Sequence, residues 1–281
     1  MLTCAALILN HNGRHLLASL YDSLLTQERL TAIVLIDNAS TDDSIAFTEA
    51  HYPTVEIIRN SVNLNFGTAY NRAVRTRSED LIFIVNNDVV VHPDAVRNAV
   101  EFLESHADVA SVSFEGLDPQ RNGAYGNSCP PLRRFGKELS PARHFQGPHD
   151  SPIASPCYLW GAACCIRRQI FQQIEFDEDM DWGFEDVDLG WSITRKTGMQ
   201  NVFLPSSTIF HLDSHTAQKR FRRRDIERMV SRNAVLSFAK NATALELLRA
   251  TPYILVNFVR FRERRPLLGQ FLERLKSRSA E

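Results

Sequence analysis

Long apolar runs and paired cysteines are both missing from this sequence. No stretch approaches the roughly 18–20 consecutive apolar residues of a membrane-spanning helix, and we expect no signal peptide, because no basic segment leads into an apolar run at the N-terminus. The five cysteines are odd in number and lack C-x-x-C spacing, which argues against a disulfide framework or a zinc site. We therefore expect a reduced, cytoplasmic protein.

The common phosphate-binding and hydrolase motifs are missing too. No G-x-G-x-x-G follows the first apolar run and G-x-x-x-x-G-K-[ST] occurs nowhere, which excludes the dinucleotide fingerprint and the P-loop. Neither a G-x-S-x-G elbow nor a Ser-His-Asp order is present. A phosphorylated ligand would need another means of charge neutralisation.

Charge is present in ordinary amount but is unevenly distributed. The 281 residues are 44% hydrophobic and 23% charged, with a formal net charge of −1. Residues 1–218 hold 16 Lys and Arg against 27 Asp and Glu, a balance of −11, whereas residues 219–281 hold 16 against 6, a balance of +10. The two parts are expected to present differently employed surfaces, the second a candidate for contact with membrane phosphates, nucleic acid or an acidic partner.

Apolar runs alternate with amphipathic stretches over the first 114 residues. The runs are short, rich in Val, Ile and Leu, and not alternating, which is typical of strands buried on both faces. They lie at 4–9, 32–36, 55–58, 81–85 and 109–112. This spacing predicts an α/β fold with a mainly parallel, open sheet flanked by helices. Ligands of such sheets bind at the carboxyl ends of the strands.

Two later segments differ in composition. Residues 115–156 hold seven of the twelve prolines and five of the twelve glycines, so we expect a long working loop or a partly disordered segment. The tail from Lys219 is predicted to form helices with basic faces. Within it, Thr243 and Glu246 form a capping box, and Thr251-Pro252 has the pattern of a new helix start.

Polar side chains follow three of the predicted strands. They are Asn10-His11-Asn12, Asp37-Asn38 and Asn86-Asn87-Asp88. Asn and Asp are ordinary turn residues, so one polar strand end alone would carry little weight. Because these three strand ends would meet in one crevice, together they predict a binding site.

Asp88 and His211 are candidate metal ligands. A carboxylate at a buried strand end, beside amide side chains, can hold a hard divalent cation together with water and phosphate oxygens. An equally weighted alternative is that Asp88 caps the helix that begins near Pro93. A lone His such as His211, after apolar runs, is more often structural.

The segment from Glu175 to Asp188 is the strongest anomaly. Eight of its fourteen residues are acidic and none is basic, and residues that favour burial are interleaved with them. A solvated face is the usual explanation of a charge run. The apolar neighbours indicate instead a buried helix start, where the helix N-terminus and like charges tune a carboxylate. Glu185 or Asp186 is then a candidate general base towards a hydroxyl, with helix capping as the alternative.

These residues together resemble the family 2 glycosyltransferases of GT-A fold, particularly the bacterial rhamnosyltransferase-like branch. The similarity runs in family order as far as His211, although Asn65 and Asn87 stand where Gly and Pro are common. The matching stretches are Leu7–Gly13, Ile36–Asp42, Asn63–Asn71, Val85–Asp88, Trp160–Ala162, Phe176–Leu189 and His211. The resemblance implies a Rossmann-like GT-A catalytic domain, which we assign to residues 1–218, with a basic helical extension over 219–281.

The resemblance also implies a donor site and a metal site. Asp88 would grip a divalent cation, Mg²⁺ or Mn²⁺, with Asn86 on the ribose side, and His211 is similar to a late metal ligand. Asp37 corresponds to the acid that reads the pyrimidine ring of the donor. The implied nucleotide-sugar-binding residues are Asn10, Asn12, Asp37, Asn38, Asn63, Asn71, Asn86, Asn87, Trp160 and Gly161.

The implied catalytic residues are Asp186, which corresponds to the family's base, and Glu185, which would help to place the acceptor. The reaction would be inverting transfer of a sugar, rhamnose on resemblance alone, from a dTDP- or UDP-sugar to a glycan or lipid-linked saccharide in bacterial surface polysaccharide synthesis. One base suffices, because the cation stabilises the diphosphate leaving group. The rivals are a nucleotidyltransferase acting on a sugar phosphate, which needs a Gly-rich basic loop after the first strand, and a catalytically inactive glycosyltransferase-like binding protein.

The basic extension lies mostly beyond the resemblance. Arg232-Asn233 and Lys240-Asn241 are similar to an R-N…K-N helix that often follows this catalytic domain. Residues 253–265 pair an apolar run with four arginines, so we hypothesise peripheral contact with an anionic cytoplasmic membrane surface near a lipid-linked acceptor. The alternative is an amphipathic helix packed on the domain. We expect no nucleic acid partner.

Overall fold

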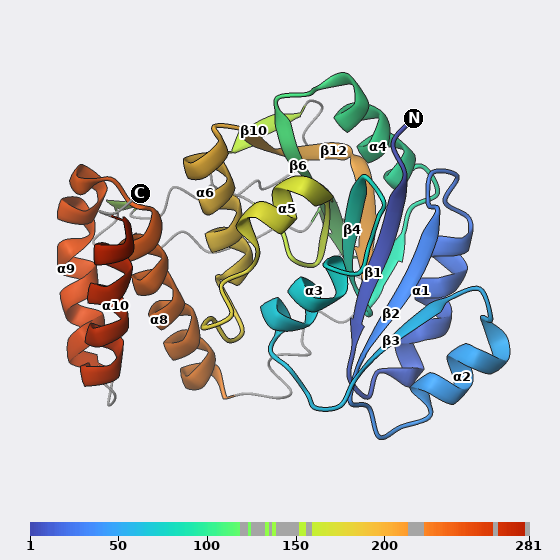
Figure 1. Ribbon diagram of the computed structural model, residues 1–281, viewed down its shortest axis with the longest axis horizontal. Helices are drawn as coiled ribbons and strands as arrows, with labels where there is room; N and C mark the ends of the chain where they lie inside the picture. The colour runs from blue at the N-terminus through green and yellow to red at the C-terminus, as the bar shows by residue number, and fades with distance from the viewer. Residues whose placement is uncertain are drawn as a thin grey trace.

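A computed structural model describes residues 1–118, 123–124, 133–134, 137–138, 152–155, 159–212, 222–260 and 264–278. The described strands are β1 (Cys4–Asn10), β2 (Ala32–Asn38), β3 (Glu56–Asn60), β4 (Leu81–Asn86), β5 (Val89–Val91), β6 (Val109–Asp118), β7 (Gly123–Ala124), β8 (Arg133–Arg134), β9 (Lys137–Glu138), β10 (Ile153–Ser155), β11 (Ala163–Arg167) and β12 (Gln200–His211). The described helices are α1 (Arg14–Leu25), α2 (Ser44–His51), α3 (Phe66–Val74), α4 (Ala95–Ser105), α5 (Arg168–Ile174), α6 (Glu185–Thr197), α8 (Arg223–Asn241), α9 (Ala244–Arg260) and α10 (Arg264–Arg278). Figure 1 shows helices on both sides of a twisted sheet, with α8, α9 and α10 grouped at one end.

The main sheet is mixed. Its strand order is β10-β12-β6-β11-β4-β1-β2-β3, with β5 paired to β12 and β7 to β6. Strands β4, β1, β2 and β3 are parallel to one another, whereas β11 runs antiparallel to both β4 and β6. The prediction of an α/β fold with helices around a mainly parallel, open sheet is confirmed. β6 and β12 pair in parallel and run in the same direction as β4, because β11 is antiparallel to both β4 and β6. Among the described strands, those that run the other way are β11, β10 and the short β5 and β7.

The first strands are buried on both faces, as their unbroken apolar character predicts. In β1, Cys4, Ala6 and Ile8 belong to a first apolar cluster beneath α1 and α4, while Ala5 and Leu7 belong to a second cluster beneath α3, α5 and α6. All five are fully buried. The alternation of side chains along a strand therefore supplies both layers at once.

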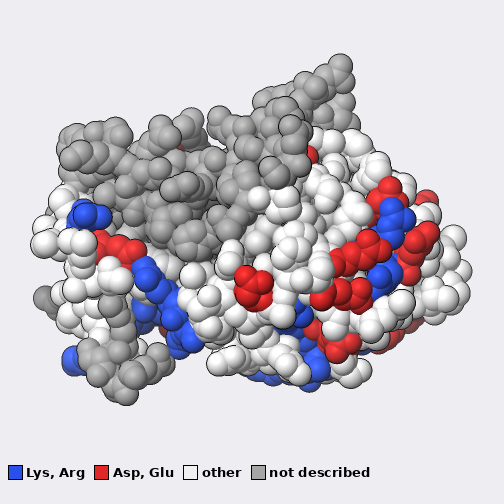
Figure 2. Space-filling model, turned by 90° about the horizontal axis from the view of Figure 1, so that it is seen from above, with Lys and Arg blue, Asp and Glu red and all other residues white. Residues whose placement is uncertain are grey.

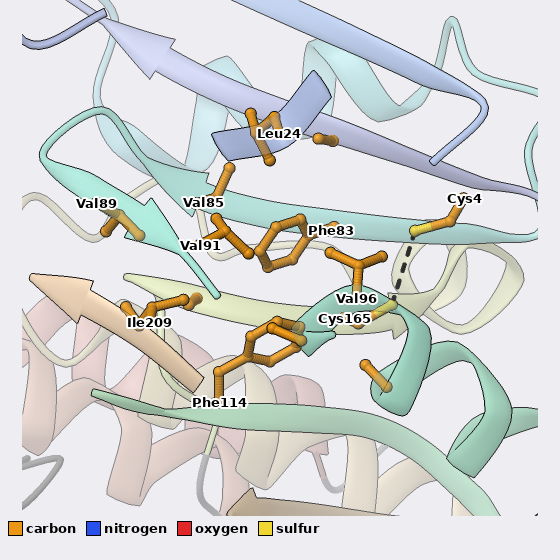
Figure 3. Close-up of a cluster of buried hydrophobic side chains, with 14 of the residues drawn as sticks. Cys4, Leu24, Phe83, Val85, Val89, Val91, Val96, Phe114, Cys165 and Ile209 are labelled. Carbon is orange, nitrogen blue, oxygen red and sulfur yellow. Dashed lines mark hydrogen bonds between the residues drawn. The ribbon is translucent and has the colours of Figure 1, made fainter. Parts of the chain in front are cut away.

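Figure 3 shows part of the first cluster. The rings of Phe83 and Phe114 stack with centroids 4.8 Å apart, and the sulfur atoms of Cys4 and Cys165 lie 4.0 Å apart. Cys164 points to the opposite cluster, and burial raises the pKa of its thiol. Cys4, Cys164 and Cys165 are free, buried thiols, as expected of structural cysteines. The two other cysteines lie outside the described residues.

The helices of the extension pack on α6 through a third apolar cluster. It consists of Met180, Phe184, Val187, Trp191, Ala234, Val235, Leu236, Phe238, Ala242, Ala250, Ile254 and Leu267. Trp191 of α6 meets Phe238 of α8 edge-on, with ring centroids 5.2 Å apart. Packing of the tail on the body is therefore observed. Among the described helices, none combines the length and apolarity that crossing a membrane requires.

Two expectations about the tail have opposite outcomes. The capping box is confirmed, because the Thr243 N–H donates to Glu246 Oε2 at 2.6 Å and the Glu246 N–H donates to Thr243 Oγ1 at 3.3 Å. The helix start at Thr251-Pro252 is wrong, because α9 runs through Pro252 without interruption. The burial of one face of α9 keeps the helix continuous through Pro252, although a proline by itself favours a break. The expected loop over 115–156 falls mostly outside the described residues.

Candidate active site

The ends of β4, β1 and β2 lie side by side, as the sequence predicts. Asn87 Nδ2 donates to Asn10 Oδ1 at 2.8 Å, which joins the end of β4 to the end of β1. His11 Nδ1 lies 2.9 Å from the carbonyl oxygen of Asn38, which joins β1 to β2. The polar turn residues therefore converge at one edge of the sheet.

Gly13 permits this convergence. A Cβ atom at this position would lie 2.3 Å from both Asn10 Oδ1 and Asn87 Nδ2, so a larger residue would break their contact. The neighbouring Asn12 has a φ of 56°, which Asn tolerates better than most residues. Asn12 Oδ1 accepts from the Thr41 N–H at 2.7 Å. The conformation of the turn after β1 thus depends on the missing side chain of Gly13 and on the positive φ that Asn12 tolerates.

A cavity of about 550 Å³ opens at this edge of the sheet. Its volume lies in the range of small-molecule and cofactor sites. Its walls come from the strand ends, the loop that leads into α3, the acidic segment and α8. The lining residues are Leu9, His11, Asn38, Asn63, Leu64, Asn65, Phe66, Asn86, Asn87, Asp88, Asp181, Trp182 and Met229.

Asp88, which lines the cavity, meets His211 from the end of β12. β5 pairs antiparallel with β12, with Val89 opposite His211, and this pairing brings His211 Nε2 to 3.1 Å from Asp88 Oδ1. The capping alternative for Asp88 is wrong, because the residue at the N-terminus of α4 is Asp94. The fold therefore brings together two residues that are far apart in the sequence, and metal binding by them stays a prediction.

The Asp88–His211 pair fits a divalent cation, with a partial protein ligand set. One carboxylate oxygen and one imidazole nitrogen converge, and Asp88 is 4% exposed. Over the described ranges, no group of three or more His, Cys, Asp and Glu residues is arranged to hold a metal ion. A cation here would take its other ligands from substrate phosphates and water, as Mg²⁺ commonly does.

Helix α6 begins directly after a turn of unusual backbone geometry. Gly183 and Phe184 have φ values of 90° and 77°, in the left-handed region that a Phe rarely adopts. The carbonyl oxygen of Gly183 accepts from Asn233 Nδ2 at 2.7 Å, and the Phe184 side chain is anchored in the third apolar cluster. Such geometry persists only where the surroundings hold it, and it is frequent at active sites.

Asp186 in the first turn of α6 is held by main-chain donors. Its Oδ2 accepts from the Gly161 N–H at 3.0 Å and its Oδ1 accepts from the Val187 N–H at 2.7 Å. Burial nevertheless raises the pKa of the Asp186 carboxyl group. A raised pKa brings a carboxylate closer to the proton affinity that a general base needs near neutral pH.

Glu185 is the more deeply buried of the two carboxyl groups. It is 7% exposed, and its Oε2 atom has no hydrogen-bond partner in the part of the chain that the structure describes. Burial, with a further contribution from Asp186, raises the pKa of Glu185 to about 8. The pair therefore favours holding one proton at neutral pH, and the deeper burial of Glu185 favours that residue as its site.

Replacing Glu185 with Gln is expected to flatten the dependence of stability on pH. The ordinary pKa is 4.5 and the folded value is about 8, so between these values the folded protein keeps a proton that the unfolded chain releases. The free energy of unfolding therefore falls as pH rises from about 5 to 8. Urea midpoints across this range should fall less steeply in Glu185→Gln than in the wild type. Glu28→Gln, at an exposed surface position, is the control, and equal slopes in all three proteins would contradict the assignment.

The R-N and K-N pairs of α8 hold the acidic segment. Arg232 Nη1 donates to the carbonyl oxygen of Asp179 at 2.9 Å. Lys240 Nζ lies 2.7 Å from Asp188 Oδ2, and Asn241 Nδ2 donates to Asp188 Oδ1 at 2.8 Å. Asp188 is fully buried in α6, so this charge depends on Lys240 for its compensation. The spacing of the two pairs along α8 thus serves one purpose, the attachment of α6 and its preceding loop.

Helix α10 adds a second cation to this attachment. Arg274 Nη2 lies 2.8 Å from both carboxylate oxygens of Asp177. Although burial opposes it, the charges of Lys240 and Arg274 lower the pKa of Asp177. Some acidic residues of the body and some basic residues of the tail therefore neutralise each other inside the molecule. The uneven charge of the sequence thus reflects internal ion pairs as well as differently charged surfaces.

Six of the predicted donor-binding residues lie outside the cavity lining, where they organise the surrounding loops. Asn10 Nδ2 donates to Ser44 Oγ at 3.0 Å, and Asn71 exchanges hydrogen bonds of 2.9 Å with the backbone of Phe176. The six are Asn10, Asn12, Asp37, Asn71, Trp160 and Gly161. Direct contact between them and a donor stays a prediction. Asn38, Asn63, Asn86, Asn87 and Asp88 do line the cavity.

Sequence reasoning missed Phe66, Trp182 and Met229 as cavity-lining residues. Trp182 is 39% exposed, unusual for a tryptophan among buried aromatics, and the acidic segment around it was the available signal. Met229 had no signal, because only the packing of α8 against the body brings it to the cavity. The extension therefore contributes to the site that the body was expected to form alone.

A family model described as Glycosyl transferase family 2 matches residues 6–174, more than half of the chain. The chain belongs to this family, its fold is the GT-A fold, and it is a glycosyltransferase. The matched range contains all three polar strand ends and stops before α6. The part of the cavity wall that contains Trp182 and Met229 thus lies beyond the matched range.

Two curated relatives from Mycobacterium tuberculosis are 27% identical to the chain in an alignment of 231 positions that covers 73% of this chain and 74% of theirs. Both, from strains CDC 1551 and H37Rv, are named N-acetylglucosaminyl-diphospho-decaprenol L-rhamnosyltransferase.

Solved structures of glycosyltransferases share the fold. GalNAc-T7 with UDP, GalNAc and Mn²⁺ matches with a TM-score of 0.62 and 18% identity over 85% of this chain, which spans 48% of that protein. The mannosyltransferase PcManGT from Pyrobaculum calidifontis, with GDP-Man and Mn²⁺, matches with 0.59 and 17% over 99% of this chain and 75% of its own. S. aureus TarS 1–349 with UDP-GlcNAc matches with 0.58 and 14%, over 97% and 79%.

Proposed function

We propose that this glycosyltransferase is metal-dependent and inverting, and that it moves a sugar from a dTDP- or UDP-linked donor to a hydroxyl group of a lipid-linked saccharide. The observation that carries the proposal is the contact of His211 with Asp88, which lines a cavity whose other strand ends carry amide side chains. The named activity of the mycobacterial relatives supports a rhamnose donor and an acceptor on a polyprenyl diphosphate. Synthesis of a bacterial surface polysaccharide at the cytoplasmic face of the membrane is the setting in which such an acceptor occurs.

The donor end of the cavity is prearranged by asparagines. Asn38 Nδ2 donates to Asn63 Oδ1 and to the Leu64 carbonyl oxygen, both at 2.8 Å, so the loop before α3 is fixed without a ligand. The neighbouring Asp37 Oδ1 is buried and has no hydrogen-bond partner among the described residues, which suits an acceptor for a pyrimidine N–H. Asp88 and His211 would hold Mg²⁺ or Mn²⁺, which when bound stabilises the negative charge of the diphosphate leaving group.

The reaction needs one proton transfer from the acceptor. As the acceptor hydroxyl oxygen forms a bond to the anomeric carbon, its proton passes to the Asp186 carboxylate, and the bond between that carbon and the diphosphate oxygen breaks. Attack from the face opposite the diphosphate inverts the configuration. Protonated Glu185 leaves Asp186 as the charged member of the pair, and the Gly161 N–H keeps its carboxylate oriented.

A nucleotidyltransferase is the weaker reading of the same fold. It requires a basic Gly-rich loop after β1 to bind a triphosphate, and Arg14 is the basic residue at that place. The Arg14 guanidinium lies over the Phe47 ring, 3.2 Å from its centroid, and Arg14 is absent from the cavity lining. An inactive binding protein is disfavoured because Asp88, Glu185 and Asp186 are all present.

A thermal-shift panel tests the donor and metal sites together. We expect UDP or dTDP, but not GDP to the same extent, to raise the melting temperature, and Mn²⁺ or Mg²⁺ to increase that shift. A nucleotide at ~100 times its dissociation constant adds about 2.7 kcal/mol to stability, which is readily measured. Asp88→Ala should lose the cation-dependent part and retain a smaller nucleotide shift. No shift with any of the three nucleotides would contradict the proposal.

We further propose that catalysis resides in residues 1–218 and that residues 219–281 form an extension that completes the acceptor side of the cavity. The contact of Met229 with the cavity and the attachment of α8 to α6 support this division of roles.

A further inference from the structure

The outer face of α9 is apolar and exposed. Leu245, Leu248 and Leu255 are 54%, 70% and 59% exposed, and helical geometry places them on one side. Ala250 and Ile254, on the opposite side, are 1% and 6% exposed within the third apolar cluster. The helix is therefore apolar on both sides, although the protein covers only one of them.

A surface of this kind marks an interaction site. Single exposed leucines are ordinary, whereas three on one side of a helix form an apolar patch of the kind that marks an interaction site. We call the strip formed by Leu245, Leu248 and Leu255 the leucine face. Leu245 and Leu248 lie about one turn apart and Leu255 about two turns further on, all on one side of the helix, so a flat apolar partner would cover them together.

The charges around the leucine face select the partner. Arg249 is exposed at its edge. The single acidic residue of α9, Glu246, is held away from it by Arg195, whose Nη2 lies 2.7 and 2.6 Å from the two Glu246 oxygens. Among the described residues, the unpaired charge at the edge of the leucine face on α9 is thus basic.

A basic rim favours an anionic membrane over a second copy of the chain. Two copies joined through the leucine face would bring their Arg249 side chains together, with unfavourable repulsion. Figure 2 shows mainly basic described side chains at the end of the molecule that holds the extension, while acidic side chains are mixed with basic ones at the opposite end. An amphipathic helix with such a rim binds at the boundary of lipid headgroups and acyl chains.

We propose that α9 lies flat on an anionic bilayer, with Leu245, Leu248 and Leu255 among the upper acyl chain atoms and Arg249 at the lipid phosphates. The leucine face by itself predicts the membrane binding. Only the purpose of that binding, which is to bring the cavity to a lipid-linked acceptor, rests on the proposed function. Because α9 packs on α8, and α8 carries Met229 at the cavity, the bound face and the acceptor side belong to one group of helices.

Vesicle co-sedimentation of the full chain tests this surface. Vesicles of phosphatidylcholine and phosphatidylglycerol in equal parts are compared with vesicles of phosphatidylcholine alone, at low salt. We expect the wild type to bind the anionic vesicles, and the variant Leu245→Ser, Leu248→Ser, Leu255→Ser to bind them at least tenfold more weakly. Leu25→Ser, at an exposed leucine of α1 that is 52% exposed, is the matched control and should bind like the wild type.

Each outcome of these measurements either supports the membrane proposal or contradicts it. Wild-type sedimentation with anionic vesicles only, lost in the triple variant, supports the proposal. Absence of wild-type binding, or equal binding by the triple variant, overturns it, as does a wild-type dimer in light scattering that the triple variant abolishes. Nucleotide thermal shifts are measured on the same proteins, so a failure of the membrane surface is distinguished from a failure of the donor site. An unchanged nucleotide shift in the triple variant also shows that it is folded.

Discussion

The Asp186→Asn variant is expected to bind nucleotide as the wild type does and to lose sugar transfer by roughly 10²–10⁴-fold, the usual contribution of a general base. Asparagine keeps the size of the side chain and an oxygen for the Gly161 N–H, which donates to Asp186 Oδ2 at 3.0 Å. It removes the charge that accepts the acceptor proton. The measurement pairs the thermal shift with UDP or dTDP against the turnover of the donor on a lipid-linked saccharide.

Two control proteins make this result specific. Glu28→Gln removes an exposed carboxylate and should change neither binding nor turnover. Glu185→Gln keeps the neutral form that burial already imposes at neutral pH, so it should retain far more activity than Asp186→Asn. Transfer at the wild-type rate by Asp186→Asn would remove Asp186 as the base.

The Lys240→Met variant is expected to lose about 3–5 kcal/mol of stability, the cost of leaving one member of a buried ion pair without its partner. Asp188 is fully buried and lies 2.7 Å from Lys240 Nζ, and methionine fills similar space without charge. Asn241 would remain as a hydrogen-bond donor to Asp188, but it carries no charge. Urea denaturation followed by tryptophan fluorescence measures the loss.

The matched control is Lys276→Met, at an exposed lysine of α10, which should stay within about 0.5 kcal/mol of the wild type. The double variant Lys240→Met, Asp188→Asn removes both charges and should recover a large part of the lost stability. A Lys240→Met protein as stable as the wild type would show that Asp188 has no need of this cation.

The N-terminal half of the fold was predictable because each of its strands can be recognised from the apolar pattern of its own residues. A run such as 81–85 is apolar without alternation only if both faces are buried, and that condition already implies a sheet between two helix layers. β11 could not be placed in this way. Its apolar residues are compatible with any internal strand, and its antiparallel position between β4 and β6 depends on pairings across long sequence distances.

The site was predictable to the extent that strand ends determine it. Asn10, Asn38 and Asn87 come together because parallel strands end at the same edge, which needs no knowledge of side-chain packing. The approach of His211 to Asp88 was different, since it depends on the antiparallel pairing of the short β5 with β12. The left-handed turn at Gly183 and Phe184 was equally hidden, because a phenylalanine gives no local sign of that geometry.

Because α8 is attached to α6, the division of the sequence at residue 218 does not separate two independent structural units. Ending the polypeptide at residue 218 would strip Trp191 and Phe184 of their apolar neighbours and remove the two α8 side chains that bind the Asp188 carboxylate, Lys240 and Asn241. The helix that carries Asp186 therefore comes from one part of the sequence and is held in place by another. Grafting the first 218 residues onto another acceptor-binding tail would therefore succeed only if the new tail also supplied the equivalents of Asn233, Lys240 and Asn241.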